Sequence, residues 1–567
     1  MIPWTVPGDS LQTTAVPGAR TRPAVAPSPA SWRRPGPRAL RVTAALLGLA
    51  AICGYAGIAV ARLGYPFPLE VLESNSLVEV HRILAGQPLY PAPTVSYVPD
   101  GYPPLYFAVS AAAASVLGQS YLALRLVSLV SSLACFAIVA RLVHRETASA
   151  AAGLAAAGLL AGTYFATGTW FDVARVDSLF LALSIAGLCM ARCMRTWRGA
   201  ITTGLLLGAA FLTKQTALAE GVAVLSAIAA GPRRRLAVAA GLAYAAVLGG
   251  STLALGLASH GWYLYYAFEQ MSEHALSVAA AGQFWAGYLL PTLGLAIAAV
   301  LLGARRVPLV LVSGSVALAT EGYAALVHTG GGVNDLLPAY LAVALLAGLA
   351  LGDQPGPGPG PGAGHLAVPR GQPATAMRPA APAAVVLLVI VQLALLAAGF
   401  RPGHAIPARA DRAAGLRLAA GLRALGGTVA VPADPALAVM AGLPQVEDQF
   451  AAVDVLRASD SPAKAAFARS VAAEVAARRF TVIVTELDGD LRGFPPDLPR
   501  YYHRCPQMPL AGIPPAPFRK SAAIQPVSVW LPAGRWSCTA VARMLGGPPA
   551  AGLATQPGTQ PTSGASR

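Results

Sequence analysis

The chain has 567 residues, of which 55% are hydrophobic and only 12% are charged, and its formal net charge at pH 7 is +16. Because a soluble globular domain carries about 25% charged residues, this composition excludes an ordinary soluble protein and indicates a polytopic membrane protein. The positive charge does not point to nucleic acid, since the arginines gather just beyond the ends of apolar runs, as the positive-inside rule describes. These clusters are Arg33, Arg34, Arg38 and Arg41; Arg141 and Arg145; Arg192, Arg195 and Arg198; Arg233, Arg234 and Arg235; and Arg305 and Arg306.

The N-terminal part of the chain predicts a cytoplasmic tail followed by a first membrane helix. Residues 1–39 are rich in Pro, Ala, Ser and Arg and are expected to be disordered. The apolar run from about 42 to 60 is preceded by too long a polar region for a cleaved signal peptide, so we expect it to span the membrane. With Arg41 inside, residues 63–103 form an acidic first external loop.

The later basic clusters set the direction of the following helices. We expect a short helix on the outer side at 104–118, either re-entrant or lying at the surface, and a full membrane crossing at 121–142. If both segments crossed the membrane, Arg141 and Arg145 would lie outside, against the positive-inside rule. Helix 148–167 then runs outward and helix 178–192 returns. The stretch 200–230 is expected to form a helical hairpin around Lys214. Four more apolar segments follow, at 236–258, 285–303, 308–327 and 336–352.

The C-terminal third of the chain changes character. The transmembrane domain of residues 40–352 is followed by a Pro/Gly-rich cytoplasmic linker, 353–382, and a last transmembrane helix, 383–399. Residues 401–545 carry "TVAVPAD" and "TVIVTELD", typical of buried strands, around a helical stretch, and predict an extracytoplasmic α/β domain. Cys505 and Cys538 lie in it and can form a disulfide if it is exported. Residues 546–567 are expected to be a disordered tail.

The predicted fold class is therefore mainly α. We expect a transmembrane helical bundle of about 10–12 membrane segments with a small C-terminal extracytoplasmic α/β domain.

Charged residues inside "TWFDVARVDSLF" need an explanation, because apolar stretches flank them on both sides. If the segment begins a helix, Asp172 and Arg175 are three residues apart and pair on one face, which leaves Asp177 without a partner. One interpretation is an interfacial helix end with a solvated pair and a capping aspartate. The other is an outward-facing polar site, since ionisable residues at membrane depth are functional by default.

The first external loop contains a second candidate. "LESNSLVEVHRILAG" predicts an amphipathic helix that lies along the membrane surface, with Glu73 on the apolar arc and Glu79 on the solvated face. A carboxylate that faces inward is partly desolvated, which raises its pKa and suits proton abstraction. Alternatively, Glu73 precedes the helix and only complements its dipole.

Two further motifs are candidates for binding an anion. Lys214 in "FLTKQT" lies between two short apolar segments, where it either extends to the membrane interface or binds a lipid phosphate. His328, Asn334 and Asp335 in "VHTGGGVNDLLPAY" precede a helix whose N-terminus can hold an anion. The sequence has no Walker A loop, HExxH or EF-hand motif and no cysteine pair with zinc-site spacing, so we predict no metal site and no cofactor and leave the metal requirement open.

The ordered set of motifs resembles the GT-C superfamily of membrane glycosyltransferases, in the bacterial branch related to protein mannosyltransferases and lipid A aminoarabinose transferases. The motifs are "PLEVLESNSLVEVHRILAGQPLY", "YPPLYF", "RLVSLVSS", "WFDVARVDSLF", "FLTKQT" and "GGVNDLLPAY", which cover roughly residues 40–350. The C-terminal domain also looks like the extracytoplasmic domain of some members. An Asp-Glu pair often opens the first loop in the family, whereas this chain has Glu70-Val71-Leu72-Glu73. Either Glu70 or Glu73 can therefore correspond to the glutamate of the family's motif.

This resemblance implies an inverting transfer of a sugar from a polyprenyl-phosphate donor in the membrane to an outward-facing glycan, lipid or protein acceptor. It implies a carboxylate base, with Glu73 as first candidate and Glu70 as second. Asp177 is a further implied catalytic residue. The residues implied for binding the substrates are Arg175, Asp172, Lys214, Tyr102, His328, Asn334 and Asp335. The location implied is the bacterial plasma membrane, with the N-terminus cytoplasmic. The competing hypothesis is a transporter or flippase of a lipid-linked or small polar substrate, which explains charge inside a membrane equally well.

Overall fold

The computed structural model describes residues 37–70, 72–303, 307–352, 381–457, 461–485, 491–505, 528–534 and 536–545. Residues 1–36 of the predicted tail 1–39, the predicted tail 546–567 and most of the predicted linker, 353–380, lie outside the described residues, as do Arg305 and Arg306. The last three residues of the predicted N-terminal tail begin helix α1 instead.

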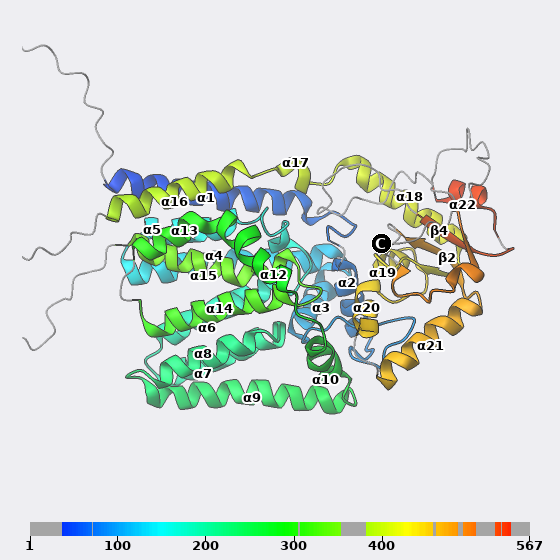
Figure 1. Ribbon diagram of the computed structural model, residues 1–567, viewed down its shortest axis with the longest axis horizontal. Helices are drawn as coiled ribbons and strands as arrows, with labels where there is room; N and C mark the ends of the chain where they lie inside the picture. The colour runs from blue at the N-terminus through cyan, green and yellow to red at the C-terminus, as the bar shows by residue number, and fades with distance from the viewer. Residues whose placement is uncertain are drawn as a thin grey trace, which may run out of the picture.

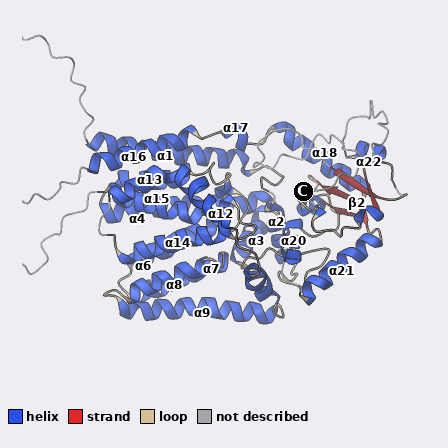
Figure 2. Ribbon diagram, in the orientation of Figure 1, coloured by secondary structure: helices blue, strands red, loops and turns tan. Residues whose placement is uncertain are grey.

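Most of the described chain is a bundle of roughly aligned helices, and a smaller α/β domain lies at one end of it (Figures 1 and 2). The helices of the bundle are α1 (Pro37–Leu63), α4 (Tyr121–Thr147), α5 (Ala150–Gly162), α6 (Asp177–Cys193), α7 (Trp197–Thr213), α8 (Ala217–Ala229), α9 (Arg234–Ala258), α12 (Val278–Gln283) with η3 (Phe284–Leu289) and α13 (Leu290–Leu302), α14 (Leu309–Val327), α15 (Leu337–Leu351) and α16 (Ala381–Ala398). This mainly α architecture with a small C-terminal α/β domain is the predicted fold class.

Six helical segments of the described chain are long and apolar enough to cross a membrane, and a bent pair, Ala383–Ala398 with Pro402–Leu425, makes a seventh if it counts as one span. The shorter apolar helices α5 and α8 pack beside them. Segment α3 (Leu105–Leu117) is short, whereas α4 has 27 residues, in agreement with the predicted outer helix followed by a full crossing.

Small residues bring α1 and α5 into close contact. A Cβ atom at Gly158 would lie 2.1 Å from the Cα of Gly48, and one at Gly153 would lie 2.3 Å from the carbonyl oxygen of Ala140 on α4. Helices in membranes associate through such close backbone packing because lipid supplies no hydrophobic drive between them. The first part of the bundle is therefore tightly packed around α5.

The C-terminal domain contains a four-stranded sheet with the order β1-β2-β4-β3. Its strands are β1 (Thr428–Ala430), β2 (Phe480–Thr485), β3 (Tyr502–Arg504) and β4 (Ser528–Pro532), and its main helices are α18 (Arg409–Leu425), α19 (Pro435–Met440), α20 (Gln449–Arg457), α21 (Pro462–Ala476) and α22 (Cys538–Met544). Strands β1 and β2 pair in parallel, and α21 lies between them in the sequence, as the βαβ-like pattern predicted. Strand β4 is antiparallel to both of its neighbours. Cys505 and Cys538 form a disulfide.

The first external loop lies between the bundle and this domain. The sequence predicted that its helix α2 (Glu73–Leu84) lies along the open membrane surface. This prediction is wrong, because α2 is buried from Glu73 to Val80. The C-terminal domain covers it: the Ser74 hydroxyl donates to the Asp434 carboxylate at 2.6 Å and accepts a hydrogen bond from the Ala436 amide. The sequence pattern of α2 could not show this, because the covering residues lie about 360 positions away.

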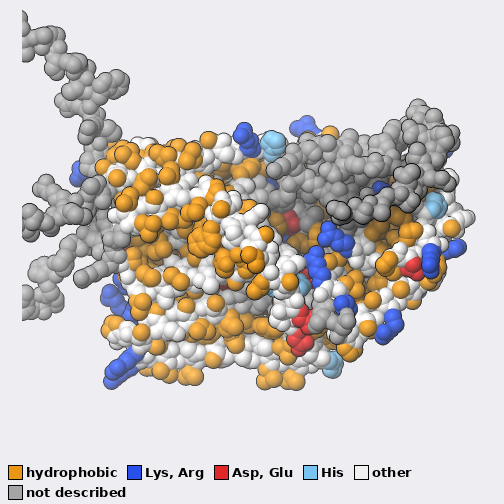
Figure 3. Space-filling view, in the orientation of Figure 1, with side chains coloured by type: hydrophobic (Ala, Val, Ile, Leu, Met, Phe, Trp, Pro, Cys, Tyr) orange, Lys and Arg blue, Asp and Glu red, His pale blue; other side chains and the backbone are white. Residues whose placement is uncertain are grey.

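The two ends of the bundle differ in the charges that they carry. Many hydrophobic side chains lie on the helical body (Figure 3). Lys and Arg lie at the end farthest from the α/β domain, at the junction and on the domain itself, whereas Asp and Glu lie near the junction and on the domain. The basic turn between α6 and α7 is therefore expected to face the cytoplasm and the α/β domain the opposite side.

Reporter fusions test this orientation. Alkaline phosphatase fused after Arg478, in the turn before β2, should be active, and the same enzyme fused after Arg195 should be inactive, because phosphatase folds only outside the cytoplasm. A cytoplasmic reporter such as green fluorescent protein should give the opposite result at both positions. Active phosphatase at Arg195 and inactive phosphatase at Arg478 would show that the orientation is inverted.

Candidate active site

A cavity of about 710 Å³ lies where the outer ends of the helices meet the C-terminal domain. Its wall on the bundle side includes Tyr102, Arg175, Lys214, His328 and Asp335, five of the residues singled out in the sequence. The wall on the domain side comes from α20 and includes Phe450, Asp454 and Arg457. The sequence motifs therefore converge on one cavity, which the C-terminal domain completes.

Lys214 is the centre of a buried charge cluster. It follows the last residue of α7, and its ammonium nitrogen lies 2.9 Å from Asp177 Oδ1 and 3.1 Å from Asp335 Oδ1. The indole of Trp170 donates to the other oxygen of Asp177 at 2.8 Å. The expectation that Asp177 has no partner is therefore wrong. Asn334 does not line the cavity but lies against Asp335, to which its amide donates at 3.5 Å.

Arg175 lies on the same wall of the cavity and binds two groups of the first external loop. Its guanidinium contacts Asp100 Oδ2 at 3.0 Å and donates to the hydroxyl of Tyr102 at 3.2 Å, and it also stacks over the Tyr102 ring. Burial by itself would lower the pKa of Arg175, but the neighbouring Tyr102 and acidic groups raise it, so this side chain remains a cation.

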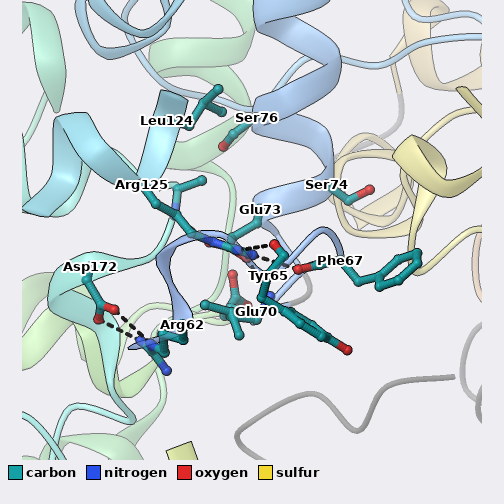
Figure 4. Close-up of polar contacts among 12 residues, drawn as sticks. Arg62, Tyr65, Phe67, Glu70, Glu73, Ser74, Ser76, Leu124, Arg125 and Asp172 are labelled. Atoms are coloured by element: carbon teal, nitrogen blue, oxygen red, sulfur yellow. Dashed lines mark hydrogen bonds and ion pairs between the residues drawn. The ribbon is translucent and has the colours of Figure 1, made fainter. Parts of the chain in front are cut away.

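The predicted pair between Asp172 and Arg175 does not form. After the short turn η1 (Trp170–Asp172) the backbone is extended at Val173, so the two side chains are not on one helix face. Asp172 instead forms a two-pronged ion pair with Arg62 at the end of α1, at 2.6 and 2.7 Å, and accepts a hydrogen bond from Tyr164 (Figure 4). Asp172 does not line the cavity and has a structural partner 110 residues away.

Glu73 is held in the same way by Arg125 of α4 (Figure 4). Both carboxylate oxygens accept from the guanidinium, at 2.9 and 2.7 Å, and each also accepts from a backbone amide, that of Ala174 or of Leu69. Burial alone would raise the pKa of Glu73, but Arg125 and the amides outweigh it and hold the pKa below its ordinary value. The predicted raised pKa is therefore wrong, and Glu73 does not line the cavity.

The other glutamates of the loop are buried as well. Burial raises the pKa of Glu70 to about 8, although Arg175 and the amide of Leu72 act in the opposite direction. Glu79 is fully buried rather than solvated, and burial raises its pKa well above the ordinary value. One Glu79 oxygen accepts from the backbone amide of Asp100. Neither glutamate lines the cavity.

Asp100 is the carboxylate that the sequence analysis did not select. It lines the cavity, its Oδ1 accepts from the Asn75 amide at 2.8 Å, and its Oδ2 lies 3.0 Å from Arg175. The available signal was its position directly before the "GYPPLYF" turn, which carries Tyr102 into the same cavity. Within the described residues, the one group of three metal-binding side chains within reach of a common ion is His503, Cys505 and Cys538, of which two form the disulfide.

Comparisons with known proteins agree with this architecture. The family described as dolichyl-phosphate-mannose-protein mannosyltransferase matches residues 101–263. ArnT from Cupriavidus metallidurans, solved bound to undecaprenyl phosphate and in the apo state, superimposes with a TM-score of 0.51 at 14% identity, over 86% of this chain and 97% of that chain. The archaeal oligosaccharyltransferase AglB from Archaeoglobus fulgidus, in complex with an inhibitory peptide and a dolichol-phosphate, gives a TM-score of 0.46 at 11% identity, over 80% of this chain and 70% of that chain. No functionally curated protein matches the chain significantly.

The fold and the family match together define a multi-pass membrane protein with the fold of the GT-C glycosyltransferases. The resemblance predicted from the motifs is thereby confirmed.

The ion pair of Glu73 leads to a stability prediction. Glu73→Gln should lower the free energy of unfolding by about 3–5 kcal/mol, because it leaves the fully buried Arg125 without its counter-charge. Thermal unfolding of the purified protein in nanodiscs would measure this.

The matched control is Glu146→Gln, which breaks a partly exposed pair with Arg192 and should cost less than about 1 kcal/mol. Equal melting temperatures for Glu73→Gln and the wild type would contradict a structural role for this pair.

Proposed function

We propose that the protein is an integral membrane glycosyltransferase of the bacterial plasma membrane. It transfers a sugar from a polyprenyl-phosphate donor to an extracytoplasmic glycan, lipid or protein acceptor and inverts the anomeric carbon. The observation that supports this most directly is the single cavity that holds a carboxylate, Asp100, together with the cations Arg175 and Lys214. The structural similarity to an ArnT solved with undecaprenyl phosphate supports the choice of donor.

The position of the cavity suits a reaction between a lipid-linked and a water-soluble substrate. It lies at the ends of the membrane helices, away from the basic ends of the bundle, and the C-terminal domain covers it. The lipid tail of the donor can remain in the membrane while the sugar enters the cavity. The acceptor approaches from the side of α20.

In the proposed reaction Asp100 is the general base. Its carboxylate takes the proton of the acceptor hydroxyl, the hydroxyl oxygen bonds to the anomeric carbon, and the bond between this carbon and the phosphate oxygen breaks. The leaving polyprenyl phosphate keeps the electron pair of that bond. Arg175 and Lys214 stabilise its developing charge.

Some residues first implied for catalysis or for substrate binding have a different part in this proposal. Glu73 and Asp172 fix the loops through Arg125 and Arg62, and Asp177 positions Lys214. Asp100 replaces Glu73 as the base because Asp100 lines the cavity and Glu73 does not. Each oxygen of Glu73 also accepts from two buried donors, whereas each oxygen of Asp100 accepts from one.

Replacement of Asp100 tests the assignment of the base. Asp100→Asn keeps the size of the side chain but cannot accept the proton, so turnover should fall about a hundredfold or more. Complementation of a deletion strain would be measured by mass spectrometry of its lipid-linked sugars and envelope glycans. The variant should leave the donor accumulated and the product missing.

Glu70→Gln is run in parallel and should complement the deletion, since Glu70 does not line the cavity. If Asp100→Asn is fully active and Glu70→Gln is inactive, the general base is Glu70 of the acidic first loop and not Asp100.

Lys214 is predicted to act on the donor. A charge-assisted hydrogen bond to phosphate is worth about 1.5–3 kcal/mol, so Lys214→Gln should weaken use of the donor about ten- to a hundredfold. Kinetics with membranes that contain the accumulated donor should show the loss mainly at low donor concentration. A normal transfer rate at every donor concentration would leave Lys214 with a purely structural role.

A further inference from the structure

Two glutamates lie inside the helical bundle without any ion-pair partner. Glu220 of α8 and Glu321 of α14 are 0% and 4% exposed, and within the described chain none of their four carboxylate oxygens has a hydrogen-bond partner. An ionisable side chain at membrane depth is costly, and it is normally retained because it takes part in function. The reaction described above does not use these two residues.

Both carboxyl groups lie directly beneath the cavity. Thr216 lines the cavity four residues before Glu220, and Ala325 lines it four residues after Glu321. Residues four apart lie on the same face of a helix, one turn above each other, so each carboxyl group is one turn below the cavity wall. Helices α8 and α14 pack against each other, and Glu220 is close enough to Glu321 to interact with it electrostatically.

The groups that surround the pair offer little positive charge. Ser184 of α6 is fully buried beside Glu220, and its neutral hydroxyl is the polar side chain that acts on this carboxyl group. Thr216 lies beside Glu321, and Tyr244 of α9 donates its hydroxyl to a backbone carbonyl, that of Leu218. The nearby cation is Lys214, which already contacts two carboxylates, Asp177 and Asp335.

This arrangement creates a problem for an anionic ligand. At Lys214 one cation faces two carboxylates, and a phosphate bound there adds further negative charge one helical turn from the glutamate pair. Two adjacent carboxyl groups in an apolar bundle cannot both be ionised without a counter-charge, so the pair is suited to hold a proton.

We propose that Glu220 and Glu321 form a proton-binding site that takes up a proton from the cavity when polyprenyl phosphate binds beside Lys214. This inference rests on the proposed function, because it assumes that the lipid phosphate occupies the cavity. The uptake neutralises one carboxylate beneath the ligand and so reduces its repulsion. By linkage, binding of the lipid strengthens proton binding by the same factor as the proton strengthens lipid binding.

Isothermal titration calorimetry tests this directly. The full-length protein in nanodiscs is titrated with undecaprenyl phosphate in Tris and in HEPES, whose ionisation enthalpies differ, near pH 8, well above the second pKa of a phosphate monoester at about 6. The difference between the buffers gives the protons taken up per lipid bound. Wild type should take up about one proton more than Glu321→Gln or Glu220→Gln.

The control is Glu146→Gln. Glu146 lies near the C-terminal end of α4 and pairs with Arg192, so this variant should take up as many protons as the wild type. Equal proton uptake by all four proteins would overturn the inference and leave the proposed function intact, whereas failure of the wild type to bind the lipid would overturn the proposed function itself. If a glutamine variant unfolds, infrared difference spectra of the wild type decide: lipid binding should increase the band of a protonated carboxyl group, and an unchanged band overturns the inference.

Discussion

The structure depends on one constraint: a charge buried among apolar helices must meet an opposite charge there or be neutralised by a proton, because the cost of leaving it uncompensated is several kcal/mol. Four such contacts lie at the ends of the helices near the α/β domain, and together they hold the loops that surround the cavity. They are Arg62 with Asp172, Arg125 with Glu73, Arg175 with Asp100, and Lys214 with Asp177 and Asp335. Each joins segments that are far apart in the sequence, so the ion pairs define which loops meet.

These contacts fall into two groups that differ in their access to the cavity. The pairs of Arg62 and Arg125 are shielded on all sides, with side chains that are 0–2% exposed, and they fix the ends of α1 and α4 (Figure 4). The contacts of Arg175 and Lys214 line the cavity, where a substrate can reach them. An acid at membrane depth is therefore not by itself a catalytic candidate. What distinguishes Asp100 from Glu73 is that Asp100 lines the cavity, so a ligand can contact it.

The sequence was sufficient for the fold but not for the partners of the charged residues. Apolar runs and basic clusters located the helices, because membrane insertion depends on local composition, and short apolar runs around a helical stretch identified the buried strands β1 and β2. The partner of Asp172 was missed because Arg62 lies at the end of an apolar helix 110 residues earlier. Burial of Glu79 was missed because an amphipathic pattern shows that one face is polar, but not whether another domain covers that face. Asp100 was passed over because no periodic pattern marks a loop residue.

The C-terminal domain belongs to the site and is not a separate appendage. Its β1–α19 segment contacts Ser74 at the start of α2, and the amide of Glu447 donates to the carbonyl of Val95 in the first external loop, at 2.9 Å. This contact excludes water from the face of α2 that carries Glu79, where burial raises the carboxyl pKa. It also brings α20 to the cavity, so that one wall comes from the bundle and the other from the domain. The proposed reaction between a membrane lipid and a soluble acceptor would use both walls, because residues of the bundle and of the domain line the cavity together.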